Sequence, residues 1–484
     1  MTATVAAARL ERDPLGEKAV PADAYWGVQT QRGIENFAIS GLRPHPLFVR
    51  ATVLVKRAAA MANRSTGRLD PDVADAIIAA ADEAIEGRPM RDGRPLTDHF
   101  RIDPFQAGAG TSHNMNANEV LANRALELLG DERGNYARVS PNDHVNMAQS
   151  TNDVIPTAMR IAALDGISAL LPALDELIAA FDAKAREFDH VVKAGRTHLQ
   201  DAVPIRLGQE FAAYALTLTR AGGRIKHAAD AIREQNIGAT AVGTGLNAEP
   251  EYIERVVANL ADLTGHDLRT ADSLVQATQS MAPMLEVSAS LRALAVDLLK
   301  ISEDLRIMSS GPRTGIGEIR LPAVQPGSSI MPGKVNPVMA ECLSMVCFHV
   351  IGNDTAVAAA AAAGQLELNV MMPMISHDTL ESLTLLTNMC RTFADDCVAG
   401  IEANEERATS LVEESSAMAT PLAPYLGYAL AAEISKEAVA TGRTIRQIVL
   451  DRGIFTADEL DQLLDPWELT SPGVAGGMRF TPRL

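Results

Sequence analysis

The chain has 484 residues and a formal net charge of −18, with 61 acidic against 43 basic side chains. A surface this acidic repels nucleic acid and anionic membranes, so neither is expected as a partner, although a small anion can still bind at a locally positive site. Hydrophobic residues make up 47% of the chain and aromatic residues only 4%, which predicts a large core of aliphatic side chains.

The cysteines lie in apolar, helix-like segments and are predicted to be buried thiols rather than parts of a disulfide framework. They are Cys342, Cys347, Cys390 and Cys397. Neither they nor the ten histidines show the spacing of a zinc site, so no metal is predicted. No stretch offers about 18 uninterrupted apolar residues, and the first residues lack the order of a secretory signal. The expected location is the cytoplasm.

Along the chain, the N-terminal part up to about residue 149 combines turn signals, short helical patterns and polar loops. Long patterns with apolar residues at helical spacing then cover residues 156–190, 206–235, 276–310, 335–363 and 371–402. From about Asn404 short helices and acidic loops return, with Pro466 and Pro472 as breakers.

Continuous strand patterns are scarce, and helical patterns of about 30 residues exceed the usual length of a globular helix. The sequence therefore predicts a mainly α fold with a long central helical bundle over residues 150–403. A smaller N-terminal domain (residues 1–149) and a small helical C-terminal domain (residues 404–484) are expected on either side of it.

Four polar segments lie where long helical patterns begin or end, and each contains glycine or is followed by proline. They cover residues 106–114, 149–153, 195–201 and 327–336. The first, around Thr111, suits either a turn before a helix or a backbone packed against a ligand. The second, with Ser150, Thr151 and Asn152, is what any helix N-terminus needs. The same hydroxyl and amide donors also bind carboxylates.

The third segment places Thr197 beside His198, and a lone histidine is more often structural than catalytic, although both side chains can donate to an anion. The fourth segment belongs to a connection of about 25 residues between long helical patterns, which is unusual in a compact domain unless it is functional. It carries Ser328, Ser329, Lys334 and Asn336, and Lys334 could also be an ordinary solvated lysine.

Two stretches resemble nucleotide-binding motifs, but their surrounding sequence does not fit such motifs. The stretch from Gly327 to Lys334 resembles a P-loop, but five residues separate its glycines and Val335 stands where Ser or Thr should hold magnesium. Gly243-Thr-Gly245 follows no strand and lies in no βαβ unit. No cofactor is therefore predicted.

The spacing of these segments bears on assembly. Asn152 precedes, and Thr197 follows, a helical pattern of about 35 residues, which at 1.5 Å per residue spans about 50 Å. If that helix is straight, the two segments cannot meet within one chain. A site that uses both must then join different subunits, which predicts an obligate oligomer.

The fourth segment, Gly327-Ser-Ser-Ile-Met-Pro-Gly-Lys-Val-Asn-Pro337, resembles the signature of the aspartase/fumarase superfamily. The other three segments and residues 238–247 resemble the family in the same order, and the likeness runs from about Gly16 to Gly476. The resemblance implies a homotetramer built on a twenty-helix core, with each active site formed by three subunits.

Within the family, three positions resemble aspartases more than fumarases: Thr151, Gln325 and Val338. His198 is typical of fumarases, where Glu341 is thought to pair with it, although one subgroup of aspartases keeps the histidine. Smaller departures from the aspartase pattern leave fine substrate preference open, and they are Met372, Val324 and His113.

The resemblance implies a carbon–nitrogen lyase that reversibly removes ammonia from L-aspartate to give fumarate through an enediolate. Ser328 would be the base, acting as an oxyanion. Alternatives are a class II fumarase and, in another class, a non-catalytic crystallin-like structural protein, which would not need its loop residues intact. The residues expected to stabilise the enediolate are Thr111, Ser150, Thr151 and Ser329. The α-carboxylate is expected to bind to Thr197, Lys334 and Asn336, and the amine or the neighbouring carboxylate to Asn152 and His198. Glu341 and Met331 are expected to support the site.

Overall fold

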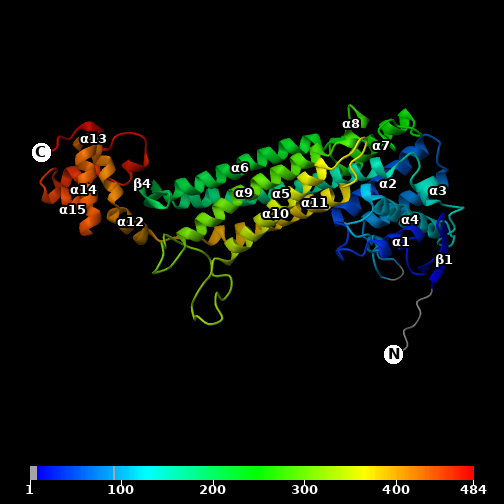
Figure 1. Cartoon of the computed structure of the whole chain (residues 1–484), viewed down its shortest axis with the longest axis horizontal. Coiled ribbons are helices and arrows are strands. Elements are labelled where there is room, and N and C mark those ends of the chain that lie inside the picture. The colour runs from blue at the N-terminus through cyan, green and yellow to red at the C-terminus, as the bar shows by residue number, and fades with distance from the viewer. Residues whose placement is uncertain (1–7, 91–92, 484) are drawn as a thin grey trace. The chain divides into compact units, whose positions relative to one another are not determined.

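The computed structural model describes residues 8–90 and 93–483 of the chain (Figure 1). These residues form sixteen α-helices, while their strands pair only in four two-stranded sheets. The prediction of a mainly α fold is confirmed.

Five long helices match the predicted helical patterns to within a few residues at most ends. They are α5 (Thr151–Glu187), α6 (Leu207–Ala231), α9 (Ala282–Met308), α10 (Val338–Ala362) and α11 (Met372–Asp396). The pattern over residues 276–310 is interrupted, because Ser280 is extended and separates α9 from the short helix α8 (Leu274–Gln279).

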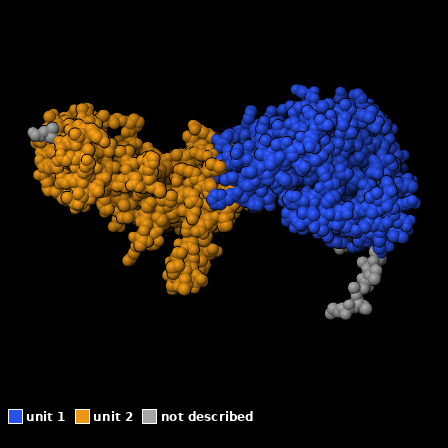
Figure 2. Space-filling model, in the orientation of Figure 1, with its two compact units in different colours: residues 1–171, 222–295, 348–387 blue, residues 172–221, 296–347, 388–484 orange. Residues whose placement is uncertain are grey.

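The described chain divides into two compact units (Figure 2). Their residue ranges assign part of each long helix to each unit. Unit 1 comprises residues 1–171, 222–295 and 348–387, and unit 2 comprises residues 172–221, 296–347 and 388–484. The division into domains at residues 149 and 403 stays a prediction.

Polar contacts join the long helices within each unit. In unit 1, the Ser288 hydroxyl of α9 donates to Asp354 of α10 at 2.8 Å. In unit 2, the Tyr214 hydroxyl of α6 donates to Asp304 of α9 at 2.8 Å. Hydrogen bonds of this kind help to fix the register of neighbouring helices.

Unit 1 contains the N-terminal helices and two small sheets. The helices are α1 (Val28–Asn36), α2 (Pro46–Ser65), α3 (Pro71–Ile85), α4 (Thr111–Leu128) and α7 (Pro250–Thr264), and the strands are β1 (Ala8–Asp13), β2 (Gly16–Pro21), β5 (Glu234–Gln235) and β6 (Arg269–Thr270). Proline opens both α2 and α3, where its missing N–H costs no hydrogen bond. Buried alanines such as Ala58, Ala74 and Ala80 let these helices pack closely.

Unit 2 contains the hairpin of β3 (Val192–Thr197) and β4 (Gln200–Arg206), and the short pair β7 (Ile319–Arg320) and β8 (Glu402–Ala403). Its C-terminal helices are short, as predicted: α12 (Glu405–Glu414), α13 (Ala423–Leu426), α14 (Tyr428–Thr441), α15 (Ile445–Asp451) and α16 (Ala457–Leu463). Capping boxes begin α15 and α16, and buried Leu422, Ile434 and Ile448 form part of their core.

Burial corrects one prediction about the cysteines. Cys347, Cys390 and Cys397 are buried, as expected, but Cys342 is exposed on α10. The prediction failed for Cys342 because an apolar helix need not be covered within a single copy.

Two helices, α5 and α10, are long and apolar enough to cross a membrane, yet the apolar window of α5 is 78% buried and that of α10 only 33%. A core helix passes the same test as a membrane span, so this is weak evidence for one.

Candidate functional site

The predicted site residues fall into both units. Unit 1 holds Thr111, Ser150, Thr151 and Asn152, and unit 2 holds Thr197, His198, Ser328, Ser329, Met331, Lys334, Asn336 and Glu341. In each unit, hydrogen bonds or ion pairs connect segments that are distant in sequence, and the two arrangements differ in their physical basis.

The first segment ends in a turn that starts α4 at Thr111. Ala109 and Gly110 both have positive φ, of 60° and 86°. A side chain at Gly110 would bring its Cβ to 3.0 Å from Ile155, so glycine is required there by both conformation and space. The exposed Thr111 hydroxyl therefore lies at a helix N-terminus, where unpaired N–H groups and the helix dipole favour anions.

The second segment forms the N-terminus of α5. The Ser150 hydroxyl accepts a hydrogen bond from Asn152 N at 3.2 Å, and Ser150 N donates to the Asp153 carboxylate at 2.9 Å. Asp153 also accepts from the backbone N–H groups of Gly238 at 3.0 Å and Thr240 at 2.9 Å. The capping interpretation is thus confirmed, and it leaves the Ser150 and Thr151 side chains partly accessible at a positive helix end.

Hydrogen bonds connect the first two segments. The Asn114 amide donates to Thr151 Oγ1 at 3.1 Å and to Asn146 Oδ1 at 3.2 Å. The ammonium of Lys56, on α2, donates to Asn146 Oδ1 and to Gln149 Oε1, both at 2.9 Å. Sequence reasoning missed Lys56 and Asn146. A lysine inside the apolar, alanine-rich stretch of residues 53–62 was the available signal.

Burial shifts the protonation of this network. Lys56 and Asp153 are both fully buried. Desolvation lowers the pKa of Lys56 to about 7 and raises the pKa of Asp153 to about 7. Burial, and then the charge of Lys56, lower the pKa of His113 to about 3, so this imidazole is neutral at physiological pH. His113, a variable position in the family motif, belongs to the core here.

The third segment is a two-residue hairpin turn. Thr197 pairs with Gln200, and the two residues between them, His198 and Leu199, both have φ of 58°. Turns with two positive φ values usually contain Asn or Gly, so His and Leu here store conformational strain. Thr197, His198 and Leu199 are all exposed, and such strain concentrates at functional sites.

A buried acid anchors this hairpin. Both carboxylate oxygens of Glu318 accept from Arg196 Nη1 at 3.0 Å, and Lys193 Nζ lies 3.3 Å from Glu318 Oε2. Glu318 is fully buried and directly precedes β7, at the start of the connection that leads to Ser328. Glu318 therefore ties the third segment to the start of the connection that leads to the fourth segment. Sequence reasoning missed it because Glu318 lies outside every segment that was singled out.

The fourth segment is folded largely on itself. Ser328 Oγ accepts hydrogen bonds from Met331 N at 2.9 Å and Ile330 N at 3.3 Å. The Asn336 amide donates to the Gly327 carbonyl, and a side chain at Gly327 would collide with the Lys334 carbonyl. Ser329 and Lys334 are exposed. A hollow of about 500 Å³ lies along this loop and is lined by Gln325, Ser328, Met331 and Lys334, among others.

Two residues singled out for the family comparison lie apart from this arrangement. Glu341 is in the first turn of α10, and among the described residues it forms no ion pair with His198. Met372 is fully buried at the start of α11.

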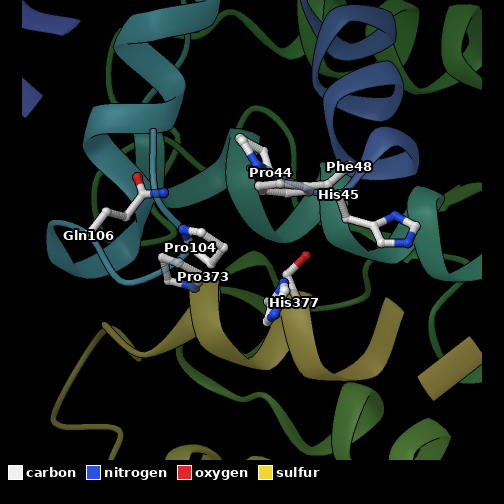
Figure 3. A pocket seen from close by; sticks show the side chains of 8 residues that line it. Pro44, His45, Phe48, Pro104, Gln106, Pro373 and His377 are labelled. Carbon is white, nitrogen blue, oxygen red and sulfur yellow. The ribbon is translucent and has the colours of Figure 1, made fainter. Parts of the chain in front are cut away.

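A further pocket lies beside the first segment (Figure 3). It is lined by Pro44, His45, Phe48, Pro104, Gln106, Pro373, Ser376 and His377, and its volume of about 10 Å³ holds a single water at most. Desolvation lowers the pKa of His45 to about 4, and its neutral ring caps α2 by accepting from Leu47 N at 3.2 Å. This pocket is a small gap between packed segments, and it is too small for a dicarboxylate.

The chain is similar to known proteins over nearly its whole length. The model of the lyase family matches residues 16–352, and that of the fumarase C C-terminus matches residues 418–471. The chain is 52% identical to aspartate ammonia-lyase of Bacillus subtilis over 97% of both chains. It is 50% identical to class II fumarate hydratase of Halobacterium salinarum, over 97% of this chain and 98% of that one.

Solved structures show the same fold. The fumarate lyase:delta crystallin from Brucella melitensis bound to cobalt superimposes with a TM-score of 0.92 at 50% identity, covering 96% of this chain and 100% of that one. A class II fumarase from Schistosoma mansoni gives a TM-score of 0.91 at 36% identity, with the same coverage.

The helical fold and the two family matches along the chain thus define the class of the protein as a lyase. The chain belongs to the lyase family, within the aspartase/fumarase superfamily, as its sequence motifs predicted. It is accordingly an enzyme, and the prediction of a lyase is confirmed.

Proposed function

We propose that this lyase removes ammonia from L-aspartate to give fumarate. The observation that carries the proposal is its likeness, over 97% of the chain, to aspartate ammonia-lyases of Bacillus subtilis and a Bacillus species at 52% and 51% identity. Thr151, Gln325 and Val338 add support, because they resemble aspartases where fumarases usually differ.

The chemical difficulty is the weakly acidic proton on Cβ of aspartate. Its removal places a second negative charge on the β-carboxylate, and catalysis requires that this enediolate be bound more tightly than the substrate. We assign this role to the hydroxyls at the N-termini of α4 and α5, those of Thr111, Ser150 and Thr151, and to Ser329. The helix ends support the assignment, because their N–H groups and dipoles favour negative charge.

We assign the base to Ser328. A serine hydroxyl is a poor base unless its oxyanion is stabilised. Two backbone N–H groups, from Ile330 and Met331, already donate to Ser328 Oγ, and they would stabilise the deprotonated oxygen in the same geometry. The exposed Lys334 on the same loop adds positive charge. Closure of this glycine-containing loop over the substrate would then exclude water.

We assign binding of the α-carboxylate to Lys334, Asn336 and Thr197. Lys334 and Thr197 are exposed and Asn336 is held in place through Gly327. Asn152 and His198 are then assigned to contact either the departing amine or the neighbouring carboxylate. The Asn152 amide already donates to the Ala241 carbonyl at 2.7 Å, so it is oriented before any substrate binds.

We further propose a homotetramer in the cytoplasm with sites shared between copies. The predicted helix between Asn152 and Thr197 is continuous over 37 residues, which corresponds to about 55 Å. The apolar α10, only 33% buried in one copy, provides a surface that another copy would cover.

Mixing of inactive variants tests the shared site. Asn152→Ala and Ser328→Ala enzymes, each inactive alone, should regain activity when dissociated and reassembled together. Ser328→Ala mixed with Lys334→Met, which alters the same segment, should show no more activity than the Lys334→Met protein that it contains. A fully active isolated monomer would contradict the proposal.

The second candidate is a class II fumarase that hydrates fumarate to L-malate. The Halobacterium relative at 50% identity and the presence of His198 favour it. A crystallin-like structural role is disfavoured, because Ser328, Lys334 and Asn336 are all intact.

The deciding experiment follows the ultraviolet absorbance of fumarate formed from L-aspartate and, in parallel, from L-malate. We expect fumarate from aspartate alone. Fumarate from malate alone would overturn the proposal and would make His198 the residue to examine in water activation.

A further inference from the structure

A buried cation lies beneath the segment that carries Ser150 and Thr151. Lys56 is fully buried, and its ammonium donates to two neutral acceptors, Asn146 Oδ1 and Gln149 Oε1. Among the described residues, Lys56 Nζ forms no ion pair, although the nearby charge of Asp153 acts on it. A buried ammonium without a direct ion pair is costly, so its charge is favoured more when further negative charge arrives nearby.

The hydrogen bonds of Lys56 lead directly to a substrate-binding side chain. Asn146 Oδ1 accepts from Lys56 Nζ at 2.9 Å and from Asn114 Nδ2 at 3.2 Å. The same Asn114 amide donates to Thr151 Oγ1 at 3.1 Å. Because Asn114 donates to it, Thr151 Oγ1 must direct its own hydrogen elsewhere, which leaves that hydrogen available to an anion.

The second contact of Lys56 fixes the backbone next to Ser150. Gln149 accepts from Lys56 through its side chain, while its backbone carbonyl accepts from Asn146 Nδ2 at 3.1 Å. Lys56 therefore contacts the side chain of Gln149 directly and its backbone carbonyl through Asn146, and Gln149 adjoins Ser150. Asn146 and Gln149 also hold other hydrogen bonds, so loss of the lysine would loosen this loop and the donors of the α5 N-terminus without unfolding it.

We propose that Lys56 is a positioning residue for the carboxylate-binding end of α5, and that binding of a dicarboxylate there draws a proton onto the Lys56–Asp153 pair. The inference rests on the proposed assignment of Ser150 and Thr151 to substrate binding. Lys56 does not touch the substrate. It acts through Asn146, Asn114 and Gln149.

The titratable groups that face Lys56 and Asp153 determine the direction of the effect. Besides this pair they are His113, on α4, and Tyr252, on α7. Burial, and then the charge of Asp153, raise the pKa of Tyr252 well above its usual value, so its phenol is neutral. His113 is neutral near pH 7, since its pKa is lowered to about 3. The pKa values of Lys56 and Asp153 both lie at about 7, so a bound dianion favours charged Lys56 and neutral Asp153. Either change takes up a proton.

The test uses the intact enzyme and succinate, a dicarboxylate that neither elimination reaction converts. Calorimetric titration at pH 7.5 in two buffers with different ionisation enthalpies measures the protons taken up on binding. We expect uptake by the unmodified enzyme and affinity that falls as pH rises above about 7. In Lys56→Met, uptake should fall by half or more, and affinity should fall about 30-fold and depend less on pH.

Two further variants separate positioning from general stability. Lys184→Met removes another mostly buried lysine, which donates to Glu187 and to the Ile401 carbonyl in unit 2, and it should leave proton uptake unchanged. Asn114→Ala keeps the Lys56 charge but cuts its route to Thr151, so affinity should fall while proton uptake persists.

The outcomes are distinct. Absence of proton uptake by the unmodified enzyme, or uptake unchanged in Lys56→Met, would overturn the role of Lys56 while leaving the proposed reaction intact. Failure of succinate to bind the unmodified enzyme at all would overturn the site assignment and this inference with it. Because succinate is used, a preference for malate over aspartate would affect only the proposed reaction.

Discussion

The end of α5 in unit 1 and the loop around Ser328 in unit 2 both present hydroxyl groups, but they are held in different ways. At α5, the buried side chains of Lys56 and Asn114 come from distant parts of the chain and fix the segment through hydrogen bonds. Asp153, within α5, accepts from the distant Gly238 and Thr240. In the loop, Ser328 is held by the backbone of its own neighbours, and Ile330 is 83% exposed.

This difference matches the two tasks that an elimination requires. Charge stabilisation works best when donors are fixed before the reaction, since no energy is then spent on reorienting them. A base on an exposed loop can instead close over a bound substrate and exclude water. The comparison indicates a rigid anion-binding face and an adaptable base, and four substitutions can test that division.

The largest effect is expected from Ser328→Ala. If the loop carries the base, turnover should fall by at least about 1,000-fold while the oligomer and its melting temperature stay unchanged. Steady-state assays, size-exclusion chromatography and thermal unfolding measure these three quantities. Normal turnover by this variant would remove Ser328 as the base and leave the loop without its assigned role.

Next in size is Thr151→Val, which keeps the shape of the side chain but removes its hydroxyl. Loss of one fixed donor to the enediolate should lower kcat by about 100-fold to 1,000-fold. A change in KM alone would show that Thr151 binds the substrate and the transition state equally, which would break the proposed rigid charge-stabilising face.

Lys334→Met is expected to raise KM by about 10-fold to 100-fold with a smaller change in kcat, because an α-carboxylate contact is made in the ground state and in the transition state alike. Initial-rate measurements over a wide substrate range give both constants. Unchanged kinetics would identify Lys334 as a solvated loop lysine.

The smallest effect is expected from Glu318→Gln, which weakens the anchor of the His198 hairpin. Glu318 and Glu210 both contact Lys193, at 3.3 and 3.1 Å, but only Glu318 contacts Arg196. We expect kcat/KM to fall about 10-fold in Glu318→Gln and to change little in the matched Glu210→Gln.

A double variant sharpens this test. If Glu318 acts through Arg196, Arg196→Lys and Glu318→Gln together should cost little more than either alone, because both remove the same contact. Equal losses in Glu210→Gln and Glu318→Gln would instead indicate a general loss of stability in unit 2.

Much of the molecule was predictable because its determinants are local. Apolar spacing along α5, α6, α10 and α11 reports a helix face directly, and it located these helices to within a few residues. The family motif around Ser328 and the capping residues before α5 are likewise contiguous in sequence.

Tertiary structure decided the features that depend on contacts between distant segments. Lys56 looked like one lysine among alanines, and only packing shows that it is buried against Asn146 and Gln149, about 90 residues further along the chain. The positive φ values of His198 and Leu199 were equally hidden, because neither residue favours that conformation by itself. Their strain is maintained by the surrounding hairpin and its Glu318 anchor.

Burial was the least predictable property, and Cys342 shows why. Periodicity states which side of a helix is apolar but not what covers that side. The sequence by itself therefore determined the family and the long helices, and it singled out the loop around Ser328. The tertiary structure decided which charges are buried and which helix faces are exposed, because desolvation depends on neighbours that no local pattern specifies.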